Sequence, residues 1–274
     1  MKAFKQLGLI AALSAMTMLS CSSLTDLTAG LNTGNPGVEK GAFSVSPNTK
    51  VFFAKGNLQY QASTGTWRFA ENQWDYIGER NEKISEANED WIDLFGWGTG
   101  YNPCKNDNDA VSYSSFNDWG KNTIINGDDK TWFTLSQGEW TYLLESRKTK
   151  SGIIYAKAIV NNVNGLILLP DSWSSFTYVL TDYNKDDASF STNRISQKVW
   201  NEKFDANGAI FLPAAGWRNG EGTRAVGTGG LYWSATSSGA AMSQSIYFND
   251  ESFYTANRDG KQFGFSVRLV TVVE

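Results

Sequence analysis

The sequence predicts an α+β fold with short strands, a few short helices and long loops. Several short segments alternate apolar with polar residues and are rich in β-branched and aromatic side chains, which is typical of strands. Three other segments carry apolar residues at helical spacing. The 26 glycines and 11 tryptophans, with only 19% charged residues, favour a loop-rich, aromatic-packed domain over a helical bundle.

The first strands are expected in FSVSPNTKVFFAKGNLQYQ and TWRFAENQWDYIG. In the first segment the positions that alternate as apolar residues are Val51, Phe53, Leu58 and Tyr60, which fits one or two strands. In the second they are Trp67, Phe69 and Trp74. A turn at residues 63–65 joins the two segments.

Residues 81–94 favour a helix, and the 36 residues after it favour a loop. Ile84, Ala87, Trp91 and Leu94 would share one side of the helix. Residues 95–130 are polar and rich in glycine. Loops of this length in a domain are usually functional or held by their own side chains. The expected anchors are Trp97, Tyr101, Phe116 and Trp119.

The clearest helix start lies at Ser136. Glu139 follows at the spacing of a capping box, in which the serine hydroxyl and the glutamate carboxylate each satisfy a free backbone N–H group. Trp140, Leu143 and Leu144 then form the buried stripe. A second short helix is expected over 196–204, with Val199, Trp200 and Phe204 facing inward.

Two segments resemble each other, NGLILLPDSW from Asn164 and NGAIFLPAAGW from Asn207. Each combines a turn with an apolar strand that ends at a proline, which has no N–H group to donate to a neighbouring strand. We therefore expect two buried strands of one mixed sheet.

The last strands are expected in LYWSAT, QSIYFND and FGFSVRLV. In FGFSVRLV, Phe263, Phe265, Val267 and Leu269 would face inward, while the small residues Gly264 and Ser266 indicate the close approach of another element. Trp233 is expected in the core. Arg268 is expected to form an ion pair or to donate to backbone carbonyls.

The N-terminus has the features of a bacterial lipoprotein signal. Lys2 and Lys5 precede an apolar stretch, Leu7 to Leu19, that is too short to span a bilayer as a mature helix. Ser20 and Cys21 then resemble a lipoprotein processing site, so Cys21 is the expected lipid-bearing residue. We expect residues 1–20 to be a signal peptide, 21–40 a flexible tether and 41–274 a single domain. The predicted location is the outer membrane of the cell envelope, facing either the periplasm or the outside.

Composition excludes several classes of function. The chain has no histidine, which removes Ser-His-Asp and Cys-His catalysis and most zinc or copper sites. The net charge is −4, and loss of Lys2 and Lys5 with the signal peptide makes it −6, so no nucleic-acid partner is expected. Acidic runs at 106–109, 127–130 and 186–187 lack the full pattern of a calcium loop. No metal or other cofactor is therefore expected.

With Cys21 lipidated, Cys104 is the remaining cysteine, and an intrachain disulfide is excluded.

The order of TLSQGEWTYLL, NGLILLP, GAIFLPAAGWR, GLYWSATSS and GFSVRLV resembles bacterial C-type-lectin-fold domains. The most similar are the paralogous surface lipoprotein domains of Fibrobacter and Bacteroides type, which are related to the formylglycine-generating enzyme fold and to retroelement-diversified variable proteins. The resemblance covers about residues 130–270. It implies a C-type-lectin-like fold, with a mixed, mostly antiparallel sheet, two short helices and long loops. It also implies that the ligand contacts lie between the last two motifs, at residues 237–262.

Within that region the composition is that of an adaptable binding surface, with Tyr and Phe for rigid contact and Ser, Asn and Gly for hydrogen bonding. The candidate ligand-binding residues are Ser237, Ser238, Asn249, Glu251, Tyr254, Asn257, Arg258 and Asp259. A solvated hairpin with ordinary turn residues is the other interpretation.

The predicted function is non-catalytic binding of a protein or glycan by a lipid-anchored protein of the cell envelope. One alternative is a calcium-independent carbohydrate-binding lipoprotein for glycan capture, using exposed Trp and Tyr. A divergent enzyme of the formylglycine-generating superfamily is disfavoured, because those enzymes use a cysteine pair near the C-terminus and this chain has no cysteine after Cys104.

Overall fold

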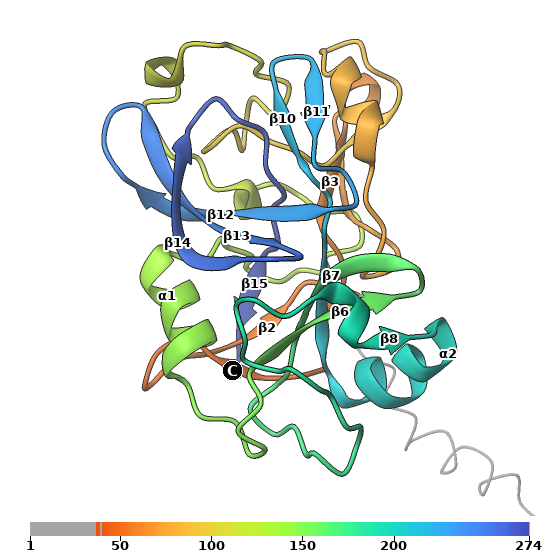
Figure 1. Ribbon diagram of the computed structural model, residues 1–274. Coiled ribbons are helices and arrows are strands. Elements are labelled where there is room, and N and C mark those ends of the chain that lie inside the picture. The colour runs from red at the N-terminus through yellow and green to blue at the C-terminus, as the bar shows by residue number, and fades with distance from the viewer. Residues whose placement is uncertain (1–36, 39, 274) are drawn as a thin grey trace, which may run out of the picture. The chain divides into compact units, whose positions relative to one another are not determined.

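Short and mostly antiparallel β-sheets build the protein, with two short helices packed against them (Figure 1). The computed structural model describes residues 37, 38 and 40–273. The predicted signal peptide, Cys21 and nearly all of the predicted tether lie outside the described residues. Within them, the predicted α+β class with mostly antiparallel strands is confirmed.

The strands are β1 (Phe43–Ser44), β2 (Lys50–Phe53), β3 (Leu58–Gln61), β4 (Thr66–Phe69), β5 (Trp91–Ile92), β6 (Tyr155–Val160), β7 (Val163–Leu168), β8 (Arg194–Ile195), β9 (Ile210–Pro213), β10 (Trp217–Asn219), β11 (Gly222–Arg224), β12 (Gly229–Ser237), β13 (Met242–Asn249), β14 (Phe253–Gly260) and β15 (Val270–Val272). The two α-helices are α1 (Gln137–Thr141) and α2 (Gln197–Val199), each extended by one π-helical turn, over Tyr142–Ser146 and Trp200–Phe204.

The two similar proline-ended segments form β7 and β9, which pair antiparallel in a sheet of order β8-β6-β7-β9. Because β6 pairs with β8 in parallel, this sheet is mixed, as predicted. Gly165 lies opposite Pro213, the last residue of β9. Every residue of β9 is buried, so the apolar run reflects burial on both faces.

The segment 81–94 is not the predicted helix. A 3₁₀-helix (Gly78–Lys83) includes only its first three residues, and Trp91 and Ile92 form β5, which pairs with β3. The buried side chain of Asn81 accepts from the backbone N–H groups of Asp93 and Leu94 at 2.9 and 3.0 Å. These long-range bonds replace the bonds that a helix would have made, so tertiary pairing overrides the local pattern.

The stretch 95–130 is a long connection with two short 3₁₀ turns, as its composition predicts. Trp97 and Trp119 are buried and Phe116 is half-buried, so these three side chains anchor it. Tyr101 is 77% exposed and does not anchor the connection, so the prediction for this residue is wrong. Its neighbour Asn102 is exposed as well, so the chain runs along the surface at this point.

Both predicted helices are confirmed. The Ser136 hydroxyl accepts from the Glu139 N–H group, and the Glu139 carboxylate accepts from the Ser136 N–H group at 2.7 Å, which completes the capping box. In the second helix Trp200 and Phe204 are buried and stack with ring centroids 5.3 Å apart.

The C-terminal segment FGFSVRLV is not the regular strand that its alternation predicts. Three residues of this segment each form a single β-bridge, Gly264 with Arg218, Phe265 with Phe95 and Ser266 with Tyr232. Only the end of the chain forms β15. All residues from 264 to 269 are buried, both those that the alternation predicts to face inward and those between them. A methyl group on Gly264 would lie 2.8 Å from the Leu94 carbonyl, so the predicted close approach is confirmed.

Arg268 lies in the core and donates to backbone carbonyls, as predicted. Its Nη1 donates to the Ala54 carbonyl at 3.0 Å and its Nη2 to the Phe211 carbonyl at 2.7 Å. Its Nε donates to the buried Asn57 side chain at 3.1 Å. Arg268 therefore connects the segment after β2 with β9.

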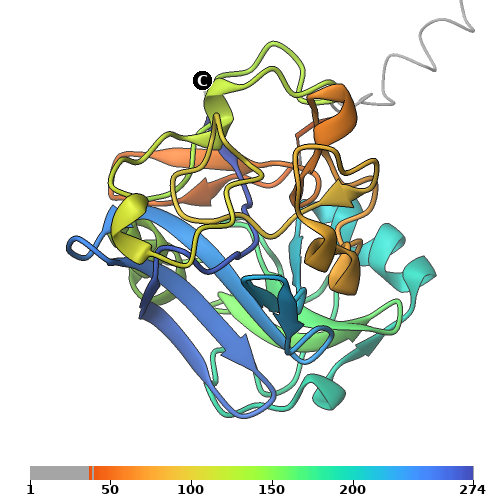
Figure 2. The same cartoon turned by 90° about the horizontal axis from the view of Figure 1, so that it is seen from above.

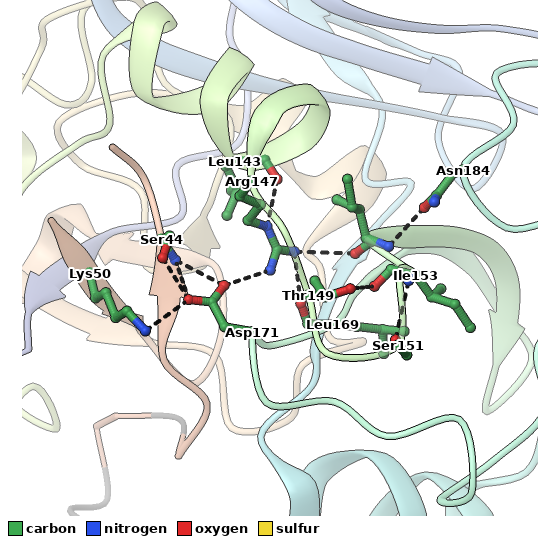
Figure 3. A network of polar contacts seen from close by, with 11 residues as sticks. Ser44, Lys50, Leu143, Arg147, Thr149, Ser151, Ile153, Leu169, Asp171 and Asn184 are labelled. Atoms are coloured by element: carbon green, nitrogen blue, oxygen red, sulfur yellow. Dashed lines mark hydrogen bonds and ion pairs between the residues drawn. The ribbon is translucent and has the colours of Figure 1, made fainter. Parts of the chain in front are cut away.

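A second arginine joins three distant segments (Figure 3). Arg147, just after the π-helical turn, donates to the carbonyls of Leu143 and Leu169 and pairs with Asp171 at 3.0 Å. Asp171 also accepts from the Ser44 hydroxyl in β1 at 2.6 Å. Burial lowers the pKa of Arg147 to about 10, although Asp171 opposes this shift. The guanidinium therefore remains charged at neutral pH and holds β1, the end of the helix and the end of β7 together.

Candidate ligand-binding sheet

The three strands β12, β13 and β14 form a separate antiparallel sheet that contains most of the predicted ligand-binding region (Figure 2). Eight residues of β14, Phe253–Gly260, form a strand where the sequence favoured a display loop. The sequence does not reveal this strand, because Phe253 is the only one of its first seven residues that is both apolar and buried. A register shift opposite Ser245 and Tyr247 also breaks the period-two alternation of the strand. This part of the predicted ligand-binding surface is therefore a rigid strand where a loop was expected.

One face of this sheet lies on the protein core. Tyr232, Ile246, Phe248 and Phe253 are buried there together, in one apolar cluster. Helix α1 packs against all three strands, and the Gln137 amide donates to the Thr255 carbonyl. This anchoring gives β14, the outer strand, a fixed position.

The other face is covered at β12 and opens towards β14. Trp233 is buried against Phe265, with ring centroids 4.1 Å apart. Across the sheet, Tyr247 is half-buried and Tyr254 is 55% exposed. The accessible part of this face therefore lies at Tyr247 and Tyr254, whereas Ser243 and Ser245 of β13 are buried.

At the end where β13 turns into β14, the predicted residues Asn249, Glu251 and Tyr254 gather. The Asn249 carboxamide oxygen accepts from the N–H groups of Glu251 and Ser252 at 2.9 and 2.7 Å, and its amide donates to the Tyr247 hydroxyl at 2.7 Å. Tyr247 and Tyr254 lie opposite each other with nearly parallel rings, 8° apart and 6.0 Å between centroids. We call this group the tyrosine end, defined by Tyr247, Asn249, Glu251 and Tyr254.

At the opposite end of the hairpin lie the other predicted residues. Arg258 Nη2 donates to the Ser238 carbonyl at 3.3 Å. Asp259 Oδ2 accepts from the Ser245 hydroxyl at 2.7 Å and from the Asn257 amide at 2.6 Å. Burial raises the pKa of Asp259, and these two hydrogen bonds oppose the rise. Ser237 is exposed at the end of β12, with its hydroxyl donating to the Gly239 carbonyl at 3.0 Å.

The structure does not bring the eight predicted residues into one pocket. Tyr254 and Arg258 are four residues apart on one strand, which corresponds to about 13 Å in an extended chain. Asn257 and Asp259 are held by Ser245, whereas Arg258 lies opposite Gln244 on the other face. A ligand contacting both ends would have to lie along the strand.

Sequence reasoning missed two residues of this face of the sheet, which are the half-buried Tyr247 and the buried Ser245 that donates to Asp259. Both belong to β13, where residues 243, 245, 247 and 249 share a face and residues 246 and 248 enter the core. The period-two pattern of QSIYFND would have identified them. The sequence interpretation chose Asn249 because the residue is polar, and it did not include Ser245 and Tyr247 of the same strand.

The aromatic side chains limit which residues could stack on a ligand. All eleven tryptophans lie in the described part of the chain, and none of them is exposed, although Trp91 and Trp217 are half-buried. The exposed aromatic side chains among residues 40–273 are Tyr101, Phe176, Tyr183 and Tyr254. Tyr254 is thus the accessible aromatic residue of the candidate sheet.

Two further features bear on chemistry. Within residues 37, 38 and 40–273, no group of three or more cysteine or acidic side chains is placed to hold a metal ion. Cys104 is a half-buried free thiol. Burial, with a smaller contribution from Glu86, raises the pKa of Cys104 to about 11, which makes it a poor nucleophile at neutral pH.

Comparisons with known proteins give one similarity. Residues 168–270 match a family model described as a domain of unknown function (DUF8237). This match begins at the last residue of β7 and covers β8, α2, β9 to β14 and the segment that bridges to Phe95, and it therefore includes the candidate sheet. No curated protein and no solved structure matches the chain.

Proposed function

We propose that this protein is a non-catalytic binding protein, anchored to the outer membrane through lipidated Cys21, with a C-type-lectin-like domain that contacts a protein or glycan through the sheet β12-β13-β14. The observation that carries the proposal is the tyrosine end. It presents an aromatic pair stacked across the paired strands β13 and β14, whose other face is buried at Phe248 and Phe253, with a carboxamide that fixes the adjacent turn. A binding surface with little conformational entropy to lose binds more tightly.

The C-type-lectin-like topology is supported by the order of motifs in the sequence and by the way the chain ends are joined. Strand β2 pairs with both β1 and β15, so the last strand returns to the first ones. In the same chain, the region between YWSAT and GFSV forms the outer hairpin of the domain.

The lipid anchor is supported by the signal sequence that precedes Cys21. None of the helices within residues 37, 38 and 40–273 has the length and hydropathy to cross a membrane. A direct test is metabolic labelling with radioactive palmitate, comparing the wild type with Cys21→Ser. Label retained by the variant would contradict the assignment.

The alternative of calcium-independent glycan capture rests on Tyr254. Its exposed ring can cover the apolar face of a sugar, and Asn249 and Glu251 lie beside it to bond hydroxyl groups. Exposed tryptophans, which the sequence interpretation also invoked, do not contribute, because none of the eleven is exposed.

The experiment that tests the binding surface is site-specific photo-crosslinking in the native host. A photoreactive amino acid replaces Tyr254 in one strain and Glu202, an exposed residue of the second helix, in a matched control strain. We expect a specific crosslinked product from position 254 that is absent from position 202. A glycan array with and without a chelator identifies a sugar ligand. Equal crosslinking at both positions, together with an empty array, would contradict the proposal.

A further inference from the structure

A groove of about 830 Å³ opens on a part of the molecule that shares no residue with the candidate sheet. It is bounded by Gln59 of β3, Arg68 of β4, the segment 71–80 and the turn between β6 and β7. Its volume is in the range of sites that hold small molecules or short oligomers. Most of its lining is polar.

Arg68 has a fixed orientation in this groove. It lies opposite Gln59 in the β3–β4 pair, and its Nε donates to the Gln59 carboxamide oxygen at 2.8 Å. Its guanidinium carbon lies 3.7 Å from the centre of the Trp91 ring. Among the described residues, no hydrogen bond or ion pair uses its two Nη atoms. The planar fork that binds carboxylates is thus held in place with its donors free.

Two other groups in the groove have free donors. Gln59 is 2% exposed, and its amide nitrogen has no partner in the described part of the chain, because only its oxygen is used by Arg68. Lys55 is half-buried and forms no ion pair within the ranges that the structure describes. Its ammonium group is therefore available to pair with an anionic ligand.

The charge of the groove differs from that of the protein. Lys55, Arg68 and Arg80 face two carboxylates, Glu71 and Asp75, which leaves a net charge of +1 in a chain whose net charge is −4. The carboxylates are close enough to raise the pKa of Arg68 slightly, against the larger lowering effect of burial. In the described residues, neither comes within 4.0 Å of a cation of the groove.

We propose that this groove binds a sugar that carries a carboxylate, such as a uronic acid unit of an acidic oligosaccharide. Arg68 holds the carboxylate through its free Nη atoms. The carboxamides of Gln59 and Asn161 bond the hydroxyl groups, and Tyr76 offers an aromatic surface to the sugar ring.

The lining favours this ligand over two others. A phosphate group carries close to two negative charges and would be repelled more strongly by Glu71 and Asp75 than a carboxylate with one charge. A peptide would bury apolar side chains, whereas the lining of this groove is mainly polar. A ligand with many hydroxyl groups and a single negative charge suits the mainly polar lining and is repelled less strongly by Glu71 and Asp75.

The test is isothermal titration calorimetry of the full chain with trigalacturonic acid at neutral pH and low ionic strength. Its methyl ester, which has the same hydroxyl groups and no charge, is the matched probe. We expect the acid to bind and the ester to bind at least about tenfold more weakly, which corresponds to one lost charge-assisted hydrogen bond. Arg68→Gln should weaken binding of the acid to a similar extent.

Lys198→Gln is the control variant, because it removes the same charge from an exposed position on α2. It should leave binding unchanged. If Arg68→Gln lowers the melting temperature, Lys55→Gln takes its place as the test. Tyr254→Ala should keep full affinity for the acid, which separates this groove from the candidate sheet.

Three results would overturn the proposal. The first is no heat of binding from the acid with the wild type. The second is equal affinity for the acid and its ester. The third is tighter binding of inorganic phosphate than of the acid, which would assign the groove to phosphate.

Discussion

The indole ring of Trp233 stacks on the ring of Phe265 with centroids 4.1 Å apart and an angle of 26° between the planes. The Trp233 Nε1 also donates to the Phe95 carbonyl at 2.7 Å. One buried side chain therefore joins β12, the C-terminal segment and the start of the long connection. The two sequence motifs YWSAT and GFSVRLV meet at this contact.

Trp233→Phe should lower the free energy of unfolding by about 2 kcal/mol, because it removes a buried hydrogen bond and leaves a cavity beside Phe265. Urea unfolding followed by fluorescence measures the change. The control is Tyr101→Phe, since Tyr101 is 77% exposed and should change stability by less than about 0.5 kcal/mol. Equal stability of the two variants would contradict this account of Trp233.

Arg268→Met should destabilise the protein by about 3 kcal/mol or more, because the carbonyls of Ala54 and Phe211 and the carboxamide of Asn57 lose a buried donor. Arg194→Met, at an exposed position of β8, is the control for the loss of one positive charge. The midpoint of thermal unfolding by circular dichroism reports both. A melting temperature within error of the wild type for Arg268→Met would show that these bonds contribute nothing net.

Asp93 should make stability depend on pH between about 4 and 6. Burial raises the pKa of this carboxyl to about 6, while hydrogen bonds from Asn81 and the Ile77 N–H group lower it. The folded state then binds the proton more tightly than the unfolded state. The stabilisation is fully present below the unfolded pKa and is lost as the pH rises through 6, by about 3 kcal/mol in total.

The measurement is urea unfolding at several pH values for the wild type and for Asp93→Asn. The wild type should gain stability relative to the variant as the pH falls from 8 to 5. Parallel curves for the two proteins would place the pH dependence elsewhere.

Cys104 should react slowly with thiol reagents. A pKa of about 11 lowers the thiolate fraction at neutral pH by about 100-fold relative to an ordinary cysteine. In a Cys21→Ser variant, where Cys104 is the sole thiol, the rate of reaction with a disulfide reagent should rise sharply on unfolding in urea. Similar rates in the folded and unfolded states would contradict the environment described for this residue.

Several elements were predictable because neighbouring residues determine them. The capping box at Ser136 needs only its own residues, and the alternation in β2 and β4 follows from one face entering the core. For the candidate site, the sequence indicated residues 237–262, most of which lie in β13 and β14. It could not show that Tyr254 and Arg258 lie towards opposite ends of one strand, because that strand was not recognised.

The sequence by itself determined the fold class, the buried pair β7 and β9, the two capped or apolar-striped helices and the absence of histidine chemistry, since each depends on local pattern or composition. Only the tertiary structure decided that Trp91 joins a strand, that residues 264–269 are buried on both sides, and that Tyr247 stacks with Tyr254. The physical reason is that these features arise from contacts between residues far apart in the chain or on different strands. Local propensity is too weak to determine them once a distant partner offers hydrogen bonds and burial.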